Sequence, residues 1–108
     1  MDKTKVIEVI EVIEFLKSAL IRNGVNVESI ALFGSALKGN MDKDSDIDLI
    51  IISPDFINLD IFERAKLTMK PETETIRNFK IPMDIMNLSP EEFNESNVKF
   101  YYNPKIVA

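Results

Sequence analysis

The sequence predicts a small α/β (α+β) domain, a mixed β-sheet flanked by helices, with residues 1–108 forming one unit. Three observations support this. A helical pattern comes first, two apolar strand-like segments follow it, and a second helical pattern precedes a third such segment. A chain of 108 residues favours one domain, because two cores of about 50 residues each would both be marginal. The 45% hydrophobic and 29% charged residues are typical of a soluble globular protein.

The first helix is expected over residues 5–21. Glu8, Glu11 and Glu14 recur at a spacing of three and mark one polar stripe, while most of the remaining circumference is apolar. This apolar face is wider than one side of a small sheet needs, so part of it is a candidate contact with another chain. Gly24 is the expected stop, because glycine tolerates the left-handed conformation that ends helices.

Four segments are predicted as strands. Residues 27–33 form the first and residues 47–52, an almost continuous apolar run, form the strongest. Residues 81–88 form the third, and residues 98–102 are expected as a strand at the edge. Together with the helices, these segments predict the mixed sheet.

Two more helical regions are expected between and after these strands. A helix over residues 61–69 would be capped by Asn58 or Asp60, and Pro71 would interrupt or end it before a further helical piece. Ser89, followed by a proline and two acidic residues, predicts the start of a short helix.

The composition excludes several chemistries. The chain has no Cys and no His, so it has no thiolate nucleophile, Cys-ligated zinc, imidazole base or His metal ligand. Catalysis would depend on carboxylates, hydroxyls, amines and hard metal ions. The net charge of −5 and the absence of a basic stripe argue against direct nucleic-acid binding. No apolar run is long enough to span a membrane and no leader pattern is present, so a cytoplasmic location is expected.

A glycine-containing turn follows the first predicted strand. Gly34 and Gly39 lie within six residues of each other, and glycine lets backbone N–H groups turn toward a bound anion. Ser35 adds a hydroxyl donor and Lys38 a positive charge. A Gly-Ser turn alone is more often plain architecture than a phosphate site.

Asp46 and Asp48 lie at the start of the strongest strand. Side chains alternate along a strand, so both carboxylates point to one face, with Cα atoms about 6.5 Å apart. Two like charges at one place repel each other unless a cation lies between them, and Mg²⁺ prefers such oxygen ligands. The alternative is a strand entry at which both aspartates simply face water.

Asp84 is the only charged residue of the third predicted strand. If that strand pairs beside the strand of Asp48, its carboxylate can reach the same metal site. The alternative is an exposed position on a strand with one wet face.

The spacing joins these features into one pattern. Gly34-Ser35, ten further residues, Asp46-x-Asp48 and a later aspartate in a strand resemble the signature of the DNA polymerase β nucleotidyltransferase superfamily. Within it, nearly the whole chain is similar to the minimal nucleotidyltransferases, which are often paired with a helical HEPN partner in toxin–antitoxin modules. The resemblance implies a polymerase β-like fold.

The resemblance also implies roles for these residues. Gly34 and Ser35 would hold the triphosphate of ATP or another NTP, and Asp46 and Asp48 would bind two Mg²⁺ ions. Asp84 would touch one metal and assist the acceptor hydroxyl. The product would be an acceptor carrying NMP, with pyrophosphate released. In antitoxin relatives the acceptor is a tyrosine of the toxin, and AMP is transferred.

One departure from the family pattern concerns the cations of the turn. Many relatives carry arginine at the positions of Ala36 and Lys38. Lys38 therefore remains as the cation expected near the phosphates, and the loss of the other one would lower nucleotide affinity.

Two functions follow as hypotheses. The first is a metal-dependent nucleotidyltransferase that modifies a HEPN-type partner as an antitoxin. The alternative is a binding module that neutralises its partner by occlusion, with no catalysis. Transfer to a small molecule is disfavoured, because nothing in the chain indicates a separate acceptor-binding domain. In either case the second wall of the site would come from a partner or from a second copy of the chain.

Overall fold

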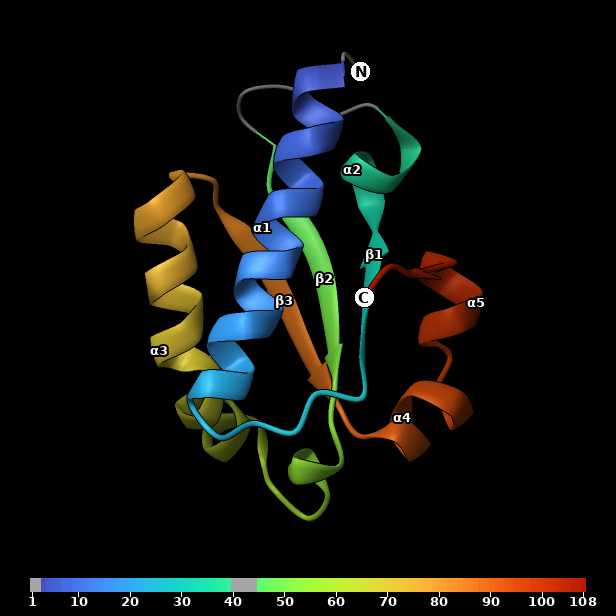
Figure 1. Ribbon diagram of the computed structural model, residues 1–108. Helices are drawn as coiled ribbons and strands as arrows, with labels where there is room; N and C mark the ends of the chain where they lie inside the picture. The colour runs from blue at the N-terminus through green and yellow to red at the C-terminus, as the bar shows by residue number, and fades with distance from the viewer. Residues whose placement is uncertain (1–2, 40–44) are drawn as a thin grey trace.

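A four-stranded mixed sheet forms the centre of the computed structural model, which describes residues 3–39 and 45–108 (Figure 1). The strand order is β3-β2-β1-β4. β1 is antiparallel to both of its neighbours, and β2 and β3 are parallel. The expected mixed sheet is therefore confirmed, with β1 at Ser29–Phe33, β2 at Ile47–Ile52, β3 at Met83–Leu88 and β4 at Lys105–Ile106.

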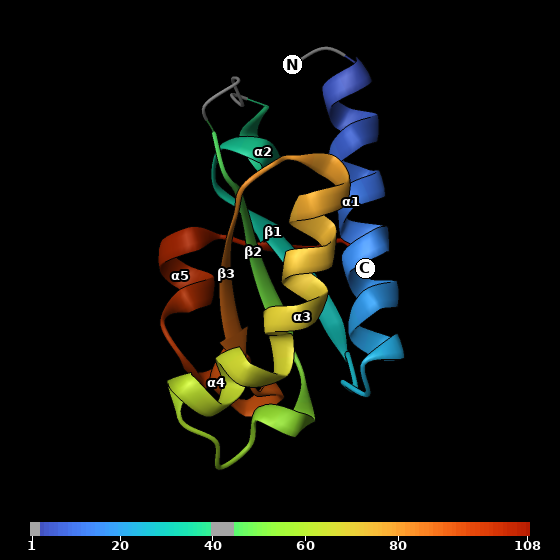
Figure 2. The same cartoon turned by 90° about the vertical axis from the view of Figure 1, so that its left-hand side faces the viewer.

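Helices cover both faces of the sheet (Figures 1 and 2). The two long helices, α1 (Lys3–Arg22) and α3 (Ile61–Phe79), lie on one face. The short helices α4 (Pro90–Glu95) and α5 (Val98–Tyr102) lie on the other. Two further short elements lie in the described part of the chain: α2 (Gly34–Lys38), which follows β1, and a 3-10 turn, η1 (Pro54–Phe56).

The sheet separates two cores, and β2 contributes to both. Ile47, Leu49 and Ile51 pack in the larger core with α1, whereas Ile50 and Ile52 pack in the smaller core beneath α4 and α5. This alternation follows from the two-residue repeat of a strand. Asp48 occupies the first position of β2 on the smaller-core face, so the same repeat that builds the cores also decides where this carboxylate points.

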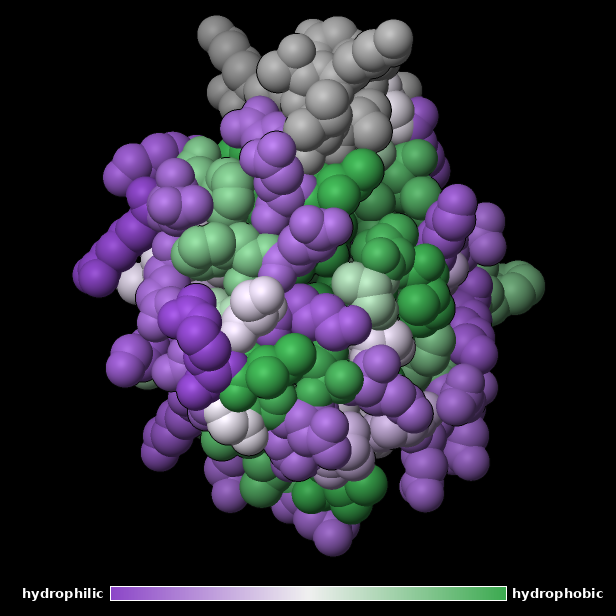
Figure 3. Space-filling model, in the orientation of Figure 1, coloured by the Kyte–Doolittle hydropathy of each residue, from purple (hydrophilic) through white to green (hydrophobic). Residues whose placement is uncertain are grey.

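Over residues 8–22 of α1, most of the apolar side chains pack within the chain. α3 packs beside α1 on the same face of the sheet, and the rings of Phe15 and Phe79 meet edge to face with centroids 5.4 Å apart. Ile10 and Ile21 of α1 remain exposed. On this side of the molecule, apolar side chains form separate patches between polar ones (Figure 3).

The prediction that Pro71 ends or interrupts a helix is wrong. α3 continues through Pro71, and Asp60, one of the two predicted caps, begins it. Proline lacks the N–H that would bond to the carbonyl four residues earlier. Pro71 is buried, however, and the packing of α3 offsets the lost bond, since tertiary contacts supply most helical stability in proteins. The hydroxyl of Thr75 also donates to the Pro71 carbonyl, at 2.8 Å.

The prediction of an edge strand over residues 98–102 is also wrong, because this segment is α5. Val98 and Tyr102 are four residues apart, so a helix places both on the side that packs against the sheet. Phe100 and Tyr101 remain exposed. β-propensity suggested a strand, but this packing decided the conformation. The edge strand of this region is β4.

The remaining helices and strands are of the predicted type, although β1 begins at Ser29, two residues later than expected. Ser89 caps α4, accepting a hydrogen bond from the Glu92 N–H, while the Glu92 carboxylate accepts one from the Ser89 N–H. β3 begins at Met83, two residues later than expected. No helix in the described part of the chain is long and apolar enough to cross a membrane.

The reciprocal cap of α3 gives a test of its start. The Asp60 carboxylate accepts from the Glu63 N–H at 2.8 Å, and Glu63 accepts from the Asp60 N–H at 3.0 Å. Asp60→Ala should lower the free energy of unfolding by about 1 kcal/mol, measured by urea denaturation. Asp60→Asn retains a capping oxygen and should lose much less. Equal losses in both variants would contradict the cap.

Candidate active site

Two of the predicted site carboxylates lie side by side on neighbouring strands. The parallel register of β2 and β3 places Asp48 opposite Asp84. Residues in register on adjacent strands point to the same face of a sheet. Ile50 and Met86, two residues further along each strand, pack in the smaller core. Asp48 and Asp84 therefore face the α4–α5 side, and the expected pairing of their strands is confirmed.

The third carboxylate, Asp46, lies immediately before β2 and is exposed. Its charge acts on Asp48. Burial raises the pKa of the Asp48 carboxyl above its ordinary value, and the negative charges of Asp84 and then of Asp46 raise that pKa further. The negative charges of Asp84 and Asp46 therefore both act on the carboxylate of Asp48.

These side chains supply the ligand type that Mg²⁺ prefers, since all three offer carboxylate oxygens. Within residues 3–39 and 45–108, no three acidic side chains converge closely enough to form a ready-made metal cluster. Burial and repulsion by the neighbouring carboxylates raise the pKa of Asp48, and a divalent cation bound beside it would lower that pKa.

The predicted glycine turn touches this group of carboxylates. Gly34 is the first residue of α2 and has a φ of +71°, a conformation that side chains rarely adopt. A Cβ at this position would overlap the carboxylate oxygen Oδ2 of Asp48 and lie 3.0 Å from its Cγ. Glycine is required here for two reasons, the backbone conformation and the close approach of Asp48.

The other residues of the turn differ in where they point. Ser35 is half-buried in the first turn of α2, next to Gly34. Ala36 is only 5% exposed and packs in the larger core, so this position of the turn faces the interior. Lys38 is exposed in the last turn of α2, four residues beyond Gly34.

An aromatic pair borders the turn and was not expected from the sequence. The ring of Tyr102 lies against that of Phe33, which directly precedes Gly34, with centroids 4.9 Å apart. Tyr102 is 47% exposed. The four-residue spacing of Val98 and Tyr102 could have predicted this aromatic pair, because a helix with that spacing places both side chains toward the sheet.

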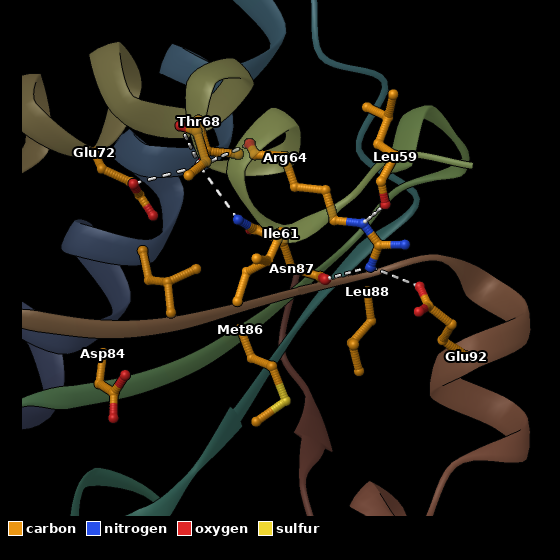
Figure 4. Close-up of a pocket in the computed structure, with 12 residues that line it drawn as sticks. Leu59, Ile61, Arg64, Thr68, Glu72, Asp84, Met86, Asn87, Leu88 and Glu92 are labelled. Carbon is orange, nitrogen blue, oxygen red and sulfur yellow. Dashed lines mark hydrogen bonds and ion pairs between the residues drawn. The ribbon is translucent and has the colours of Figure 1, made fainter. Parts of the chain in front are cut away.

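A groove of about 590 Å³ begins at Asp84 and follows the outer side of β3 (Figure 4). α3 forms its opposite wall, and Glu92 of α4 lies at its far end. The charged residues Arg64, Glu72 and Glu92 line it, and sequence reasoning assigned none of them to a site. Only the three-dimensional pairing of β3 as an edge strand reveals the groove.

Comparison with known proteins identifies the family. A family model described as a nucleotidyltransferase domain matches residues 9–107. The chain belongs to this family. As a member of the nucleotidyltransferase-domain family, it has a fold suited to transferring a nucleoside monophosphate group, which confirms the general part of the sequence-based prediction.

A solved structure agrees in fold. The crystal structure of a candidate nucleotidyltransferase from Sulfolobus solfataricus superposes on this nucleotidyltransferase domain with a TM-score of 0.70 and 17% sequence identity. The match covers 95% of this chain and 82% of the other. A search of curated proteins gave no match.

The contact between Gly34 and Asp48 predicts how three glycines differ. Gly24, Gly34 and Gly39 all have positive φ, but a Cβ would meet nothing within 4 Å at Gly24 or Gly39. Gly24→Ala and Gly39→Ala should each lower the free energy of unfolding by about 1–2 kcal/mol, the cost of left-handed backbone. Gly34→Ala should lower the free energy of unfolding by more than either of these, or displace the Asp48 side chain. Three equal losses in urea denaturation would contradict the close approach.

The raised pKa of Asp48 predicts a gain of stability when its charge is removed. Above its folded-state pKa, the folded protein carries a carboxylate that the unfolded chain tolerates better. Without added divalent cation, Asp48→Asn should raise the melting temperature at neutral pH by a few degrees. The gain should shrink as the pH falls through that pKa, where wild-type Asp48 is itself neutral. Asp60→Asn is the control and should show no gain; a melting temperature lowered by Asp48→Asn would contradict the account.

Proposed function

We propose that this nucleotidyltransferase domain transfers AMP from ATP to a hydroxyl acceptor, with Asp46, Asp48 and Asp84 as the catalytic carboxylates. The acceptor we favour is a tyrosine of a HEPN-type partner, which makes the protein an antitoxin. The observation that carries the proposal is the register of Asp48 with Asp84, directly beside the turn at Gly34.

The turn would receive the nucleotide. The backbone N–H of Gly34 would donate to a phosphate, and the adjoining Ser35 would add a hydroxyl donor. Lys38 would contribute positive charge from the end of α2. Because the carboxylate of Asp48 lies against Gly34, phosphates held at the turn would lie close to the catalytic carboxylates.

Asp46 and Asp48 would hold two Mg²⁺ ions, one of them shared with Asp84. Bound Mg²⁺ supplies Lewis-acid stabilisation of the phosphates and lowers the pKa of the acceptor hydroxyl. The acceptor oxygen forms a bond to the α-phosphorus, the bond between the α-phosphorus and the bridging oxygen breaks, and pyrophosphate leaves. Asp84 receives the acceptor proton, so the reaction needs no imidazole, in keeping with a chain that has no His.

The openness of the site supports a macromolecular acceptor. Asp46 and Asp84 are both exposed, so water reaches the carboxylates when the domain is alone. Phosphoryl chemistry is favoured when water is displaced from the reacting atoms. A protein partner that covers Asp84 would both supply the hydroxyl and close the site.

The test uses labelled ATP, Mg²⁺ and a purified HEPN-type partner. Asp46→Ala, Asp48→Ala and Asp84→Ala should each lower label transfer by about 100-fold or more, because each removes a metal ligand. Asp60→Asn, a carboxylate change at the start of α3, should transfer at the parental rate.

Two outcomes would contradict the proposal. Transfer at the parental rate by all three alanine variants would remove the carboxylates from the chemistry. Silencing of the partner by a parent protein that transfers no label would favour occlusion in place of catalysis.

A further inference from the structure

Among residues 3–39 and 45–108, no strand lies beside the outer edge of β3. β3 is the last strand in the order, and the Ile47 N–H of β2 donates to the carbonyl of Pro82 at 3.0 Å. In a parallel pair, alternate residues direct their backbone groups toward the partner strand. The N–H and C=O groups of Met83, Ile85 and Asn87 therefore point outward, away from β2.

One end of this edge is closed. Nη1 of Arg64 donates to the outward carbonyl of Asn87 at 2.9 Å and pairs with Oε1 of Glu92 at 2.7 Å. Nε of Arg64 donates to the Leu59 carbonyl at 3.0 Å. Arg64 thus occupies the edge where β3 ends and leaves the stretch toward Asp84 open.

The open stretch forms the floor of the groove described above. Asp84, Met86 and Leu88 project on one side of β3, and Asn87 projects on the other, toward Thr68 of α3 (Figure 4). The groove therefore follows the strand edge itself and reaches Asp84 at one end. A chain lying along this edge would pass directly beside a carboxylate of the proposed active site.

We propose that the acceptor is an extended polypeptide segment that adds as a further strand to the outer edge of β3 and presents its hydroxyl side chain at Asp84. This inference rests on the proposed function, because Asp84 must receive the acceptor proton. Main-chain hydrogen bonds to Met83 and Ile85 would supply affinity, and alternate side chains of the segment would supply specificity.

Charge favours a polypeptide over a nucleic acid in this groove. Among the lining residues, Arg64 is the one cation, and its side chain is 13% exposed and already paired with Glu92. Glu72 and Asp84 add two further carboxylates. A phosphate backbone would be repelled here, whereas a segment with lysine or arginine between apolar residues would be attracted.

The same charges disfavour a second copy of this chain as the occupant. Pairing of two β3 edges would place an acidic groove against an acidic groove. The side chains of the bound segment that face α3 would meet Ile61, which is exposed, and Ala65. Apolar residues suit these positions, and the hydroxyl residue would face the Asp84 side.

The probe is a nonapeptide that alternates valine and lysine around one central tyrosine. Its titration into the ¹⁵N-labelled full chain should shift the backbone amides of Ile85 and Asn87. Ala65→Trp, which fills the groove, should weaken binding at least about tenfold. Lys66→Trp places the same side chain one residue away, outside the groove lining, and should bind as the parent does.

Label transfer from ATP to the peptide separates this proposal from the proposed function. The expected result is transfer by the parent and by Lys66→Trp, and at least about tenfold less by Ala65→Trp. Transfer undiminished in Ala65→Trp, or no amide shift along β3, would overturn the docking site while leaving the transferase intact. Peptide binding without transfer would overturn the acceptor assignment. The proposed function would also fail if, in addition, the HEPN-type partner stayed unlabelled.

Sedimentation at several protein concentrations tests whether a second copy of this chain occupies the edge of β3. A dimer of the parent that Ala65→Trp dissociates and Lys66→Trp does not would assign the edge to a second copy and overturn the proposal. The expected result is the same sedimentation for all three proteins.

Discussion

The pairing of Asp48 with Asp84 across two parallel strands is the constraint on which the site depends. Like charges in register on adjacent strands destabilise a sheet, and burial adds to this at Asp48, whose pKa is raised. The rest of β2 is apolar and buried on both faces, so the surrounding structure holds the strained pair in place. A repulsion that the fold tolerates in this way is expected where function and stability conflict, and it agrees with the cation site proposed above.

The packing of the two long helices explains how that pair is held in register. Ile47, Leu49 and Ile51 fix β2 against α1, and α3 returns the chain so that β3 runs parallel to β2. A slip of one residue in either strand would turn its aspartate toward the opposite face of the sheet. The larger core therefore fixes the face on which both carboxylates lie, and Gly34 lets the turn approach them.

Much of the fold could be predicted from local patterns, and the errors have physical causes. The continuous apolar run located β2 to the residue, and Ser89 located the start of α4. The helix end predicted at Pro71 is wrong because the burial of this residue in the fold outweighs the one missing hydrogen bond. The strand predicted over residues 98–102 is a helix. Its aromatic residues favour a strand, but a helix places Val98 and Tyr102 on the side that packs against the sheet. The groove could not be predicted, since it depends on which strand lies at the edge.

The roles of the site residues need a direct measurement. ¹⁵N amide spectra of the full chain, recorded with Mg²⁺ and an ATP analogue that has a methylene between the α- and β-phosphorus atoms, test them together. The account predicts saturable shifts at Gly34, Asp48 and Asp84 that require both Mg²⁺ and the analogue. Binding of the analogue that leaves these three amides unmoved, and instead shifts amides on the α1–α3 side of the sheet, would contradict it.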